Sequence, residues 1–221
     1  MPELRQKLIT TARRMADSGL NKGTAGNLSV RAEEHGECGF LITPTGMSYD
    51  TLTPDDVVFM RLDGTHSGIH SNQRKPSSEW RFHRDLYAAR TEAGAVLHAH
   101  SPFATSLACL RRDIPAFHYM IARFGGDTLR CADYATFGTQ ELSNAALSAM
   151  QDRNACLLAN HGLLVFGRDL TQALDLGIEL EALCEQYWRA CQLGQPVLLD
   201  AAEMDVVLEK FATYGQQTPT P

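Results

Sequence analysis

The amino-acid sequence predicts an α/β fold, and three of its features carry the prediction. Apolar residues recur at helical spacing in several stretches, most clearly at 3–18 and 171–193. Short apolar runs of strand length lie between the helical stretches, most clearly at 95–99 and 155–159. Glycine, proline and asparagine separate the two kinds of segment. Helices that alternate with buried strands are typical of a sheet covered by helices.

The expected elements follow one another along the whole chain. Helices are expected at 3–18, 76–89, 102–110, 140–150, 171–193 and 203–214. Strands are expected after Gly26 and at 40–43, 57–60, 95–99, 155–159 and 163–167, with a hairpin signal at Asp63-Gly64. The acidic residues of the long helix 171–193 are expected on its solvated face; they are Asp175, Glu179, Glu181 and Glu185.

The length and composition are those of one ordinary globular domain. The chain has 221 residues, 44% of them hydrophobic and 21% charged, which is enough for a core that holds a rigid site. No internal repeat or interdomain linker is visible. We therefore expect a single domain over residues 1–221, with a mobile polar tail from about residue 212.

The charge and the cysteines exclude several classes of protein. A formal net charge of -6 argues against a nucleic-acid-binding protein and against an anchor on acidic membranes. No apolar run approaches the roughly 20 residues that cross a bilayer. The six cysteines include no CxxC pair, and the chain opens without a basic and then apolar leader. These features predict a reduced, cytoplasmic protein.

Three loops carry small polar residues suited to binding an anion. Gly26 and Asn27 follow the first helix, and Thr45 and Gly46 form a turn after the strand 40–43. Alone, such a loop is a weak signal, because most glycine and asparagine loops are ordinary turns. The third loop holds serines at the expected start of the helix 76–89, where hydroxyls either cap the helix or bind a phosphate; they are Ser77 and Ser78.

The strand 95–99 leads into His98 and His100. Alternate residues of a strand point to the same face, so both imidazoles could reach one metal ion from rigid backbone. His161, beside a glycine between two apolar runs, is the candidate third imidazole. Glu79 is either a favourable first-turn charge or, near a metal, a ligand or base. Tyr119 is a candidate proton donor, although a buried core tyrosine is the default.

Three histidines with a carboxylate suit a catalytic zinc ion better than a structural one, which usually takes cysteine sulfurs. Together with the three candidate anion-binding loops, such a site suggests a phosphorylated substrate whose oxygens would chelate the metal. The Lewis acid would stabilise an enediolate formed beside a carbonyl.

Several segments resemble the class II aldolase/adducin family in their residues and in their order, over nearly the whole chain. The segments are Gly23-Thr-Ala-Gly-Asn-Leu-Ser, Ile42-Thr-Pro-Thr-Gly, Lys75-Pro-Ser-Ser-Glu-Trp-Arg-Phe-His, His98-x-His100, Ile114-Pro-Ala-x-His-Tyr-Met-Ile, Tyr134-Ala-Thr-Phe-Gly-Thr and Asn160-His-Gly. Within the family, the aldolases of L-fuculose 1-phosphate are the most similar.

The resemblance implies a three-layer α/β/α fold with a central, largely antiparallel sheet, and a homotetramer with active sites between subunits. It implies one zinc ion per subunit, bound by His98, His100, His161 and Glu79, with Glu79 also the acid/base. Tyr119 of a neighbouring subunit would protonate the aldehyde oxygen. The phosphate of dihydroxyacetone phosphate would be held by Gly26, Asn27, Thr45, Gly46, Ser77 and Ser78. Phe137 and the tail residue Tyr214 would shape the aldehyde side.

The implied activity is reversible cleavage of a ketose 1-phosphate, L-fuculose 1-phosphate or a close analogue, into dihydroxyacetone phosphate and a short aldehyde such as L-lactaldehyde. Several alternatives stay open on the same metal site. They are an aldolase for 5-deoxyribulose or methylthioribulose 1-phosphate, a ribulose-phosphate 4-epimerase, and sugar-phosphate dehydratases and decarboxylases. The 4-epimerase resembles this chain but has Ser-Ser-Asp where this chain has Ser-Ser-Glu. The non-enzymatic alternative is an adducin-like interaction domain.

Overall fold

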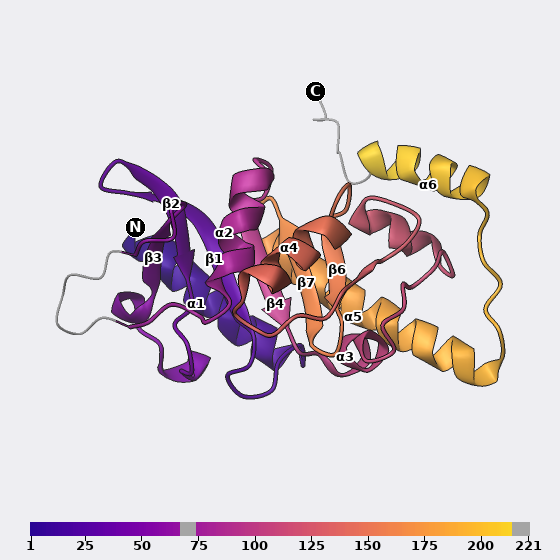
Figure 1. Cartoon of the computed structure of the whole chain (residues 1–221), viewed down its shortest axis with the longest axis horizontal. Helices are drawn as coiled ribbons and strands as arrows, with labels where there is room; N and C mark the ends of the chain where they lie inside the picture. The colour runs from indigo at the N-terminus through magenta and orange to yellow at the C-terminus, as the bar shows by residue number, and fades with distance from the viewer. Residues whose placement is uncertain (67–73, 214–221) are drawn as a thin grey trace, which may run out of the picture.

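A seven-stranded sheet forms the centre of the molecule (Figure 1). The structure, a computed structural model, describes residues 1–66 and 74–213. The strands are β1 (Asn27–Glu34), β2 (Glu37–Ile42), β3 (Val58–Arg61), β4 (Ala95–Ala99), β5 (Cys131–Ala132), β6 (Ala155–Leu158) and β7 (Gly162–Gly167). They lie in the order β3-β2-β1-β4-β7-β6-β5. Every neighbouring pair is antiparallel except β5 with β6, which confirms the largely antiparallel sheet.

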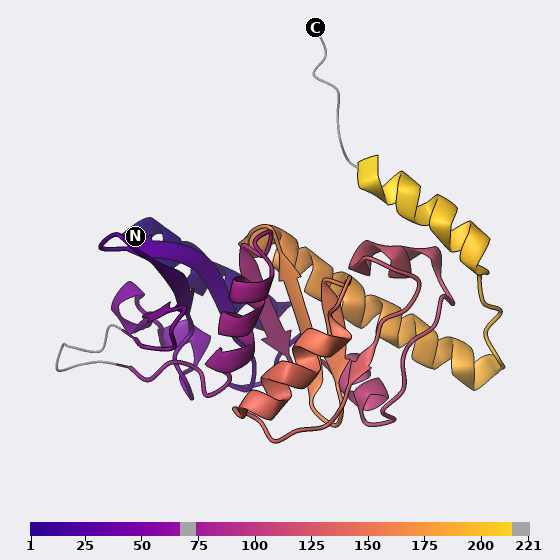
Figure 2. The same cartoon turned by 45° about the horizontal axis from the view of Figure 1, so that its top comes forward.

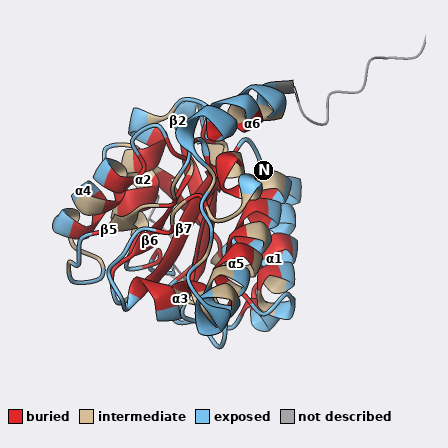
Figure 3. Cartoon of the chain, turned by 90° about the vertical axis from the view of Figure 1, so that its right-hand side faces the viewer, coloured by how far each residue is buried: buried red, intermediate tan, exposed pale blue. Residues whose placement is uncertain are grey.

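Helices cover both faces of this sheet, so the predicted three-layer α/β/α architecture is confirmed (Figure 3). The helices are α1 (Pro2–Asp17), α2 (Trp80–Ala89), α3 (Pro102–Ala108), α4 (Gln140–Ala149), α5 (Leu170–Leu193) and α6 (Ala201–Thr213), with short 3-10 segments η1 (Tyr49–Thr51), η2 (Pro54–Asp56) and η3 (Tyr119–Phe124). Helices α2 and α4 contact each other on one face, and α1, α3 and α5 pack together on the other.

The alternation of side chains along β4 decides which face receives the histidines. Ala95, Leu97 and Ala99 belong to the core beneath α1, α3 and α5. Val96 belongs to the core beneath α2 and α4. Because side chains two residues apart share a face, His98 and His100 lie on the side of α2. The ring of Phe82 in α2 meets His98 edge to face, with 5.4 Å between the ring centroids.

Helix α2 begins later than expected. The sequence places its start at Pro76, but Pro76 to Ser78 run as an extended segment and turn, and Trp80 is the first helical residue. The reason is a pairing with another part of the chain: Pro44 and Pro76 form an antiparallel bridge, and the Ser77 N–H donates to the Thr43 carbonyl at 3.1 Å. Glu79 is left at the N-terminal boundary of the helix.

Glu181 of α5 is bound to helix α3 instead of facing solvent. Its carboxylate accepts the Phe103 and Ala104 N–H groups, each at 2.8 Å, and the Ser101 hydroxyl at 2.6 Å. The first N–H groups of a helix have no partner within the helix, so a carboxylate there satisfies them and the positive end of the helix dipole. The expectation of a solvated acidic face was therefore wrong for this residue.

Helix α6 lies away from the sheet and packs on η3 (Figure 2). The rings of Tyr119 and Phe211 are stacked, with 6.3 Å between centroids. Tyr214 and the predicted mobile tail after α6 lie outside the described residues. Across the described ranges, no helix combines the length and hydropathy needed to span a membrane. All six cysteines, each within the described part, carry free thiols.

Candidate metal centre and pocket

The ends of three strands bring the histidines together. Strand β7 pairs with β4, and the tight turn between β6 and β7 carries His161. Asn160 in this turn has a φ of 52°, in the left-handed region. A Cβ atom on Gly162 would stand 2.4 Å from the Ala99 carbonyl oxygen, so only glycine allows β7 to pass this close to the end of β4. His161 is thereby delivered beside His100.

The three imidazoles surround one point with Glu79. Their ring centroids are 4.7, 4.8 and 4.9 Å apart in pairs. The Nε2 atoms of His98 and His100 are 3.0 Å apart. The Glu79 carboxylate lies 3.2 Å from His98 Nε2 through one oxygen and 3.2 Å from His161 Nε2 through the other. One ligand atom from each of these four residues lies within 4.8 Å of all the others.

This donor set fits a divalent metal ion. A tetrahedral ion with ligands at about 2.0–2.1 Å has its ligand atoms roughly 3.3–3.4 Å apart, close to the separations observed. Glu79 Oε1 is buried and has no hydrogen-bond partner, as a carboxylate oxygen reserved for a cation would be. The structure therefore brings together the four residues that the sequence nominated as ligands.

The protonation of these residues also suits a cation. The Leu163 carbonyl lies 2.8 Å from His98 Nδ1, so this nitrogen carries a ring proton and Nε2 is the atom turned to the cluster. Burial, and then the charge of His98, lower the pKa of both His100 and His161 to about 4. For Glu79, burial raises the pKa, but His98, His161 and the Asn27 amide outweigh it and bring the pKa to about 2. Neutral imidazoles and an ionised carboxylate are the metal-binding forms.

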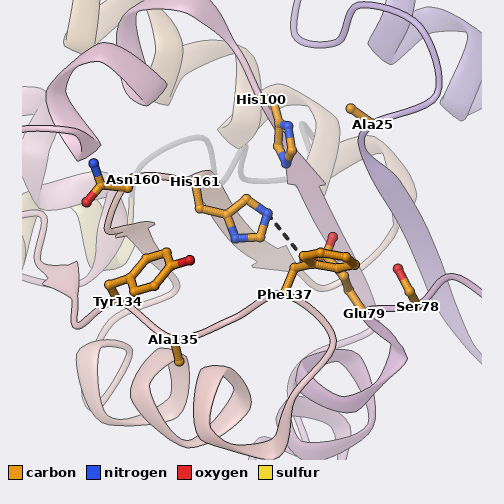
Figure 4. A pocket seen from close by; sticks show the side chains of 9 residues that line it. All are labelled: Ala25, Ser78, Glu79, His100, Tyr134, Ala135, Phe137, Asn160 and His161. Atoms are coloured by element: carbon orange, nitrogen blue, oxygen red, sulfur yellow. Dashed lines mark ion pairs between the residues drawn. The ribbon is translucent and has the colours of Figure 1, made fainter.

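A pocket of about 340 Å³ opens onto the cluster (Figure 4). Glu79, His100 and His161 form part of its wall. Tyr134 and Ala135 lie on one side of these residues and Ala25 and Ser78 on the other, with the ring of Phe137 drawn over Glu79; Asn160 completes the lining. Phe137 is 66% exposed, so an apolar surface is offered to whatever enters the pocket.

The predicted phosphate-binding residues fall into two groups. Thr45 and Gly46 are exposed and lie beside Ser77 and Ser78, because the Pro44–Pro76 bridge and the Thr45 N–H donated to the Lys75 carbonyl join the two loops. Ser78 lines the pocket. In the other group, Gly26 is packed so tightly that a Cβ atom would stand 2.6 Å from the His98 carbonyl oxygen.

Asn27, the second member of that group, is 3% exposed and bonded inside the protein. It starts β1 directly opposite His98. Its amide nitrogen donates to Glu79 at 3.0 Å, and its amide oxygen lies 2.6 Å from His83 Nε2. The sequence patterns did not point to this contact with the carboxylate, because it depends on how α2 crosses β1.

Tyr119 lies on η3, is 51% exposed, and does not line the pocket. The structure of one chain thus leaves this residue apart from the metal-binding cluster. Sequence reasoning also missed Tyr134 and Asn160 as pocket residues. Both belong to motifs that were noticed, but nothing local to those motifs says that they face the same cavity as His161.

Known proteins resemble the chain over almost its full length. Residues 6–188 match the class II aldolase and adducin N-terminal domain family. A 5-methylthioribulose-1-phosphate/5-deoxyribulose-1-phosphate aldolase of Rhodospirillum rubrum is 55% identical over 220 residues, which cover 99% of this chain and 96% of that protein.

Two L-fuculose phosphate aldolases extend the comparison. The one from Escherichia coli K12 is 46% identical over 214 residues, covering 96% of each protein. A solved structure of an L-fuculose 1-phosphate aldolase superposes with a TM-score of 0.89 at 40% identity, covering 96% of this chain and 97% of that one.

Proposed function

Because the chain belongs to the class II aldolase and adducin family and is an aldehyde-lyase, we propose that it reversibly cleaves a ketose 1-phosphate into dihydroxyacetone phosphate and an aldehyde. One observation carries the proposal: three imidazoles and an ionised carboxylate converge at the wall of a pocket that a serine and two aromatic residues also line. This intact cluster leaves no support for the alternative of a non-catalytic adducin-like interaction domain.

The proposed metal is one zinc ion per subunit, held by His98, His100, His161 and Glu79. Three nitrogen ligands and no sulfur are typical of catalytic zinc, and a fourth ligand that substrate displaces would leave the open position that chemistry needs. When bound, the ion supplies Lewis acidity that stabilises negative charge on the carbonyl oxygen of the substrate.

The phosphate of the substrate is assigned to the joined loops that carry Thr45, Gly46, Ser77 and Ser78, with Gly26 and Asn27 bordering them. The hydroxyl of exposed Ser78 favours an anion, because it can add a hydrogen bond near the positive end of the α2 dipole. Phosphate bound here would place the reactive carbons of dihydroxyacetone phosphate toward Glu79.

In the direction of bond formation, the ionised Glu79 carboxylate takes a proton from the hydroxymethyl carbon of dihydroxyacetone phosphate, which leaves an enediolate. This carbon forms a bond to the aldehyde carbon, and the aldehyde oxygen takes the proton of the Tyr119 hydroxyl; exchange with solvent then returns a proton to the Tyr119 phenolate and removes the one held by Glu79. Cleavage is the same sequence reversed: the proton of the C4 hydroxyl returns to Tyr119, the C3–C4 bond breaks, and Glu79 returns its proton to C3.

The proposed assembly is a homotetramer in which Tyr119 of one subunit reaches the pocket of another. Support comes from the position of Tyr119, which is half exposed on η3 and outside the pocket of its own chain. The free thiols support the expected reducing, cytoplasmic location.

We infer that the aldehyde carries an apolar end. Phe137, Ala135 and Tyr134 line the pocket, and Tyr214 is proposed to join them. The relative at 55% identity is named for 5-methylthioribulose and 5-deoxyribulose 1-phosphates, whereas the two described above that are named for L-fuculose phosphate are 46% and 40% identical. The first two substrates therefore take precedence over L-fuculose 1-phosphate.

The deciding experiment compares kcat/KM for L-fuculose, 5-deoxyribulose and 5-methylthioribulose 1-phosphates, with dihydroxyacetone phosphate as the measured product. We expect the 5-deoxy and 5-methylthio sugars to be preferred by about 10-fold or more, since a difference of one carbon in such a pocket is worth about 1–3 kcal/mol. A preference for L-fuculose 1-phosphate would reverse the substrate assignment. Conversion of ribulose 5-phosphate to its C4 epimer, with no triose released, would identify a 4-epimerase instead.

A further inference from the structure

A chain of hydrogen bonds runs through the protein interior and ends at Glu79. The Tyr87 hydroxyl lies 2.8 Å from Ser29 Oγ, which lies 2.6 Å from His83 Nδ1. On the other side of the ring, His83 Nε2 lies 2.6 Å from the Asn27 amide oxygen, and the Asn27 nitrogen donates to Glu79 at 3.0 Å. All five residues are buried, and His83 and Ser29 have no exposed surface.

This chain of hydrogen bonds results from the match between the helical spacing of α2 and the strand spacing of β1. Glu79, His83 and Tyr87 are spaced by four residues, so they follow one another along a single side of α2 at about 6 Å per step. Asn27 and Ser29 are spaced by two residues in β1, so they share a face about 6.6 Å apart. With α2 packed across β1, the two strand residues fit between the three helix residues.

The chemistry of the two ends fixes the direction of every bond. A carboxylate can only accept hydrogen bonds, so the amide group of Asn27 must turn its NH2 toward Glu79 and its oxygen toward His83. His83 Nε2 must then carry the ring proton and donate it. His83 Nδ1 is left as an acceptor for the Ser29 hydroxyl, and Ser29 Oγ accepts from the Tyr87 hydroxyl. Each donor thus has one acceptor.

The ring of His83 determines the orientation of the Asn27 amide. Without a donor at the position of His83 Nε2, the amide could rotate by half a turn and present its oxygen to the Glu79 carboxylate. Two acceptor oxygens would then face each other inside the protein, where a polar group without a hydrogen-bond partner lowers stability.

We propose that His83 is a positioning residue of the enzyme, which acts through Asn27 to hold the Glu79 carboxylate in place beside the three metal-binding histidines. The proposal deepens the proposed function and rests on it for the role of Glu79 in catalysis. It does not involve a change in the protonation of His83: the ring serves as a fixed donor on one side and a fixed acceptor on the other.

The test is a pair of variants that separate the two sides of the ring. In His83→Gln, the side-chain nitrogen takes the place of Nε2, so the donor to Asn27 is retained. In His83→Asn, the shorter amide reaches the place of Nδ1 and the donor to Asn27 is lost. Both variants remove the ring and its packing, so they share any purely structural loss.

Two quantities are measured on each full-length variant, at a temperature where circular dichroism shows it folded. The first is kcat with the preferred ketose 1-phosphate. The second is the affinity for zinc itself, obtained by competition with a chelator, which requires no substrate. We expect His83→Asn to lose about 10- to 100-fold in kcat and about 10-fold in zinc affinity, the usual effect of losing a partner that orients a ligand. His83→Gln should stay within about threefold of the wild type in both.

Equal losses in the two variants, or an unchanged zinc affinity in His83→Asn, would overturn the proposal, since a structural role alone does not distinguish the two amides. If the wild type cleaves no ketose 1-phosphate, the proposed function fails. The zinc measurement then still decides whether His83 positions Glu79.

Discussion

Glu79 is a buried carboxylate that its neighbours keep ionised. It is 5% exposed, and burial by itself would favour the neutral acid, yet His98, His161 and the Asn27 amide bring its pKa down to about 2. A carboxylate that is charged at neutral pH can accept a proton from carbon without first losing one. The ionised state is the one that the proposed role of Glu79 as the base requires.

Replacing this carboxylate tests its role directly. We expect Glu79→Gln to lower kcat by about 10²- to 10⁴-fold, because the amide has nearly the same shape but cannot take up the proton. Metal analysis should still find zinc bound through the three histidines. The matched control is Glu33→Gln, an exposed glutamate of β1, which should keep wild-type activity. Full activity in a zinc-containing Glu79→Gln enzyme would refute the assignment.

His83 makes the stability of the metal-free protein depend on pH. Burial, and then the charge of His98, lower its pKa to about 3 in the folded state, against an ordinary 6.5. Between pH 6.5 and 3, His83 is therefore protonated in the unfolded chain but not in the folded protein. The stability linked to this residue is complete above pH 6.5 and is lost as the pH falls toward 3.

Urea unfolding of the metal-free protein at several pH values measures this effect. Between pH 6 and 4, the free energy of unfolding of the wild type should fall more steeply than that of His83→Gln, by about 1.4 kcal/mol per pH unit for the one proton concerned. His100 and His161 contribute equally to both proteins, so the difference isolates His83. Parallel pH curves would contradict the buried, neutral state of the ring.

At the scale of elements, helix α3 depends on a carboxylate from α5. The helix has 7 residues, too few to be stable by itself, and Glu181 binds two of its first N–H groups and the Ser101 hydroxyl. This contact joins the segment directly after His100 to the longest helix of the fold. It therefore supports the end of β4, which carries His98 and His100, two of the proposed metal ligands.

We expect Glu181→Gln to lower the free energy of unfolding by about 1–2 kcal/mol, because the charge and one acceptor are lost from a partly buried cap. Glu185→Gln on the same helix is the control. Its ion pair with Arg189 is solvent-exposed and should be worth less than about 0.5 kcal/mol. Chemical denaturation measures both variants, and equal effects would show that the α3 contact adds nothing.

At the scale of the whole molecule, the proposed site needs more than one chain. Tyr119 stacks on Phe211 of α6, outside the pocket that holds Glu79. Inactive Glu79→Gln and Tyr119→Phe proteins should therefore restore activity when they are unfolded and refolded together. In an equal mixture, a site has an intact Glu79 and an intact neighbouring Tyr119 in about one case in four, so about a quarter of wild-type activity is expected.

Refolding each variant alone provides the background for this experiment. If every site used Glu79 and Tyr119 of the same chain, the mixture would show no more activity than the two variants measured separately. That result would contradict a site shared between subunits.

Much of the fold could be predicted because it follows local patterns. The 3.6-residue period marked α1 and α5, and apolar runs marked β4 and β6 to within a residue or so. Contacts between distant segments explain the errors. Helix α2 starts at Trp80 because Pro76 pairs with Pro44, and Glu181 leaves the solvated face because α3 needs a cap.

The sequence by itself determined the chemistry of this protein: which side chains could bind a metal, and that His98 and His100 share one face, since alternation in a strand is a property of the local backbone. Only the tertiary structure decided that His161 and Glu79 meet them, that Asn27 turns to Glu79 under the control of His83, and that Tyr119 stays outside the pocket. Those positions depend on how β7 pairs with β4 and how α2 crosses β1. Such contacts join residues tens of positions apart, and no local period encodes them.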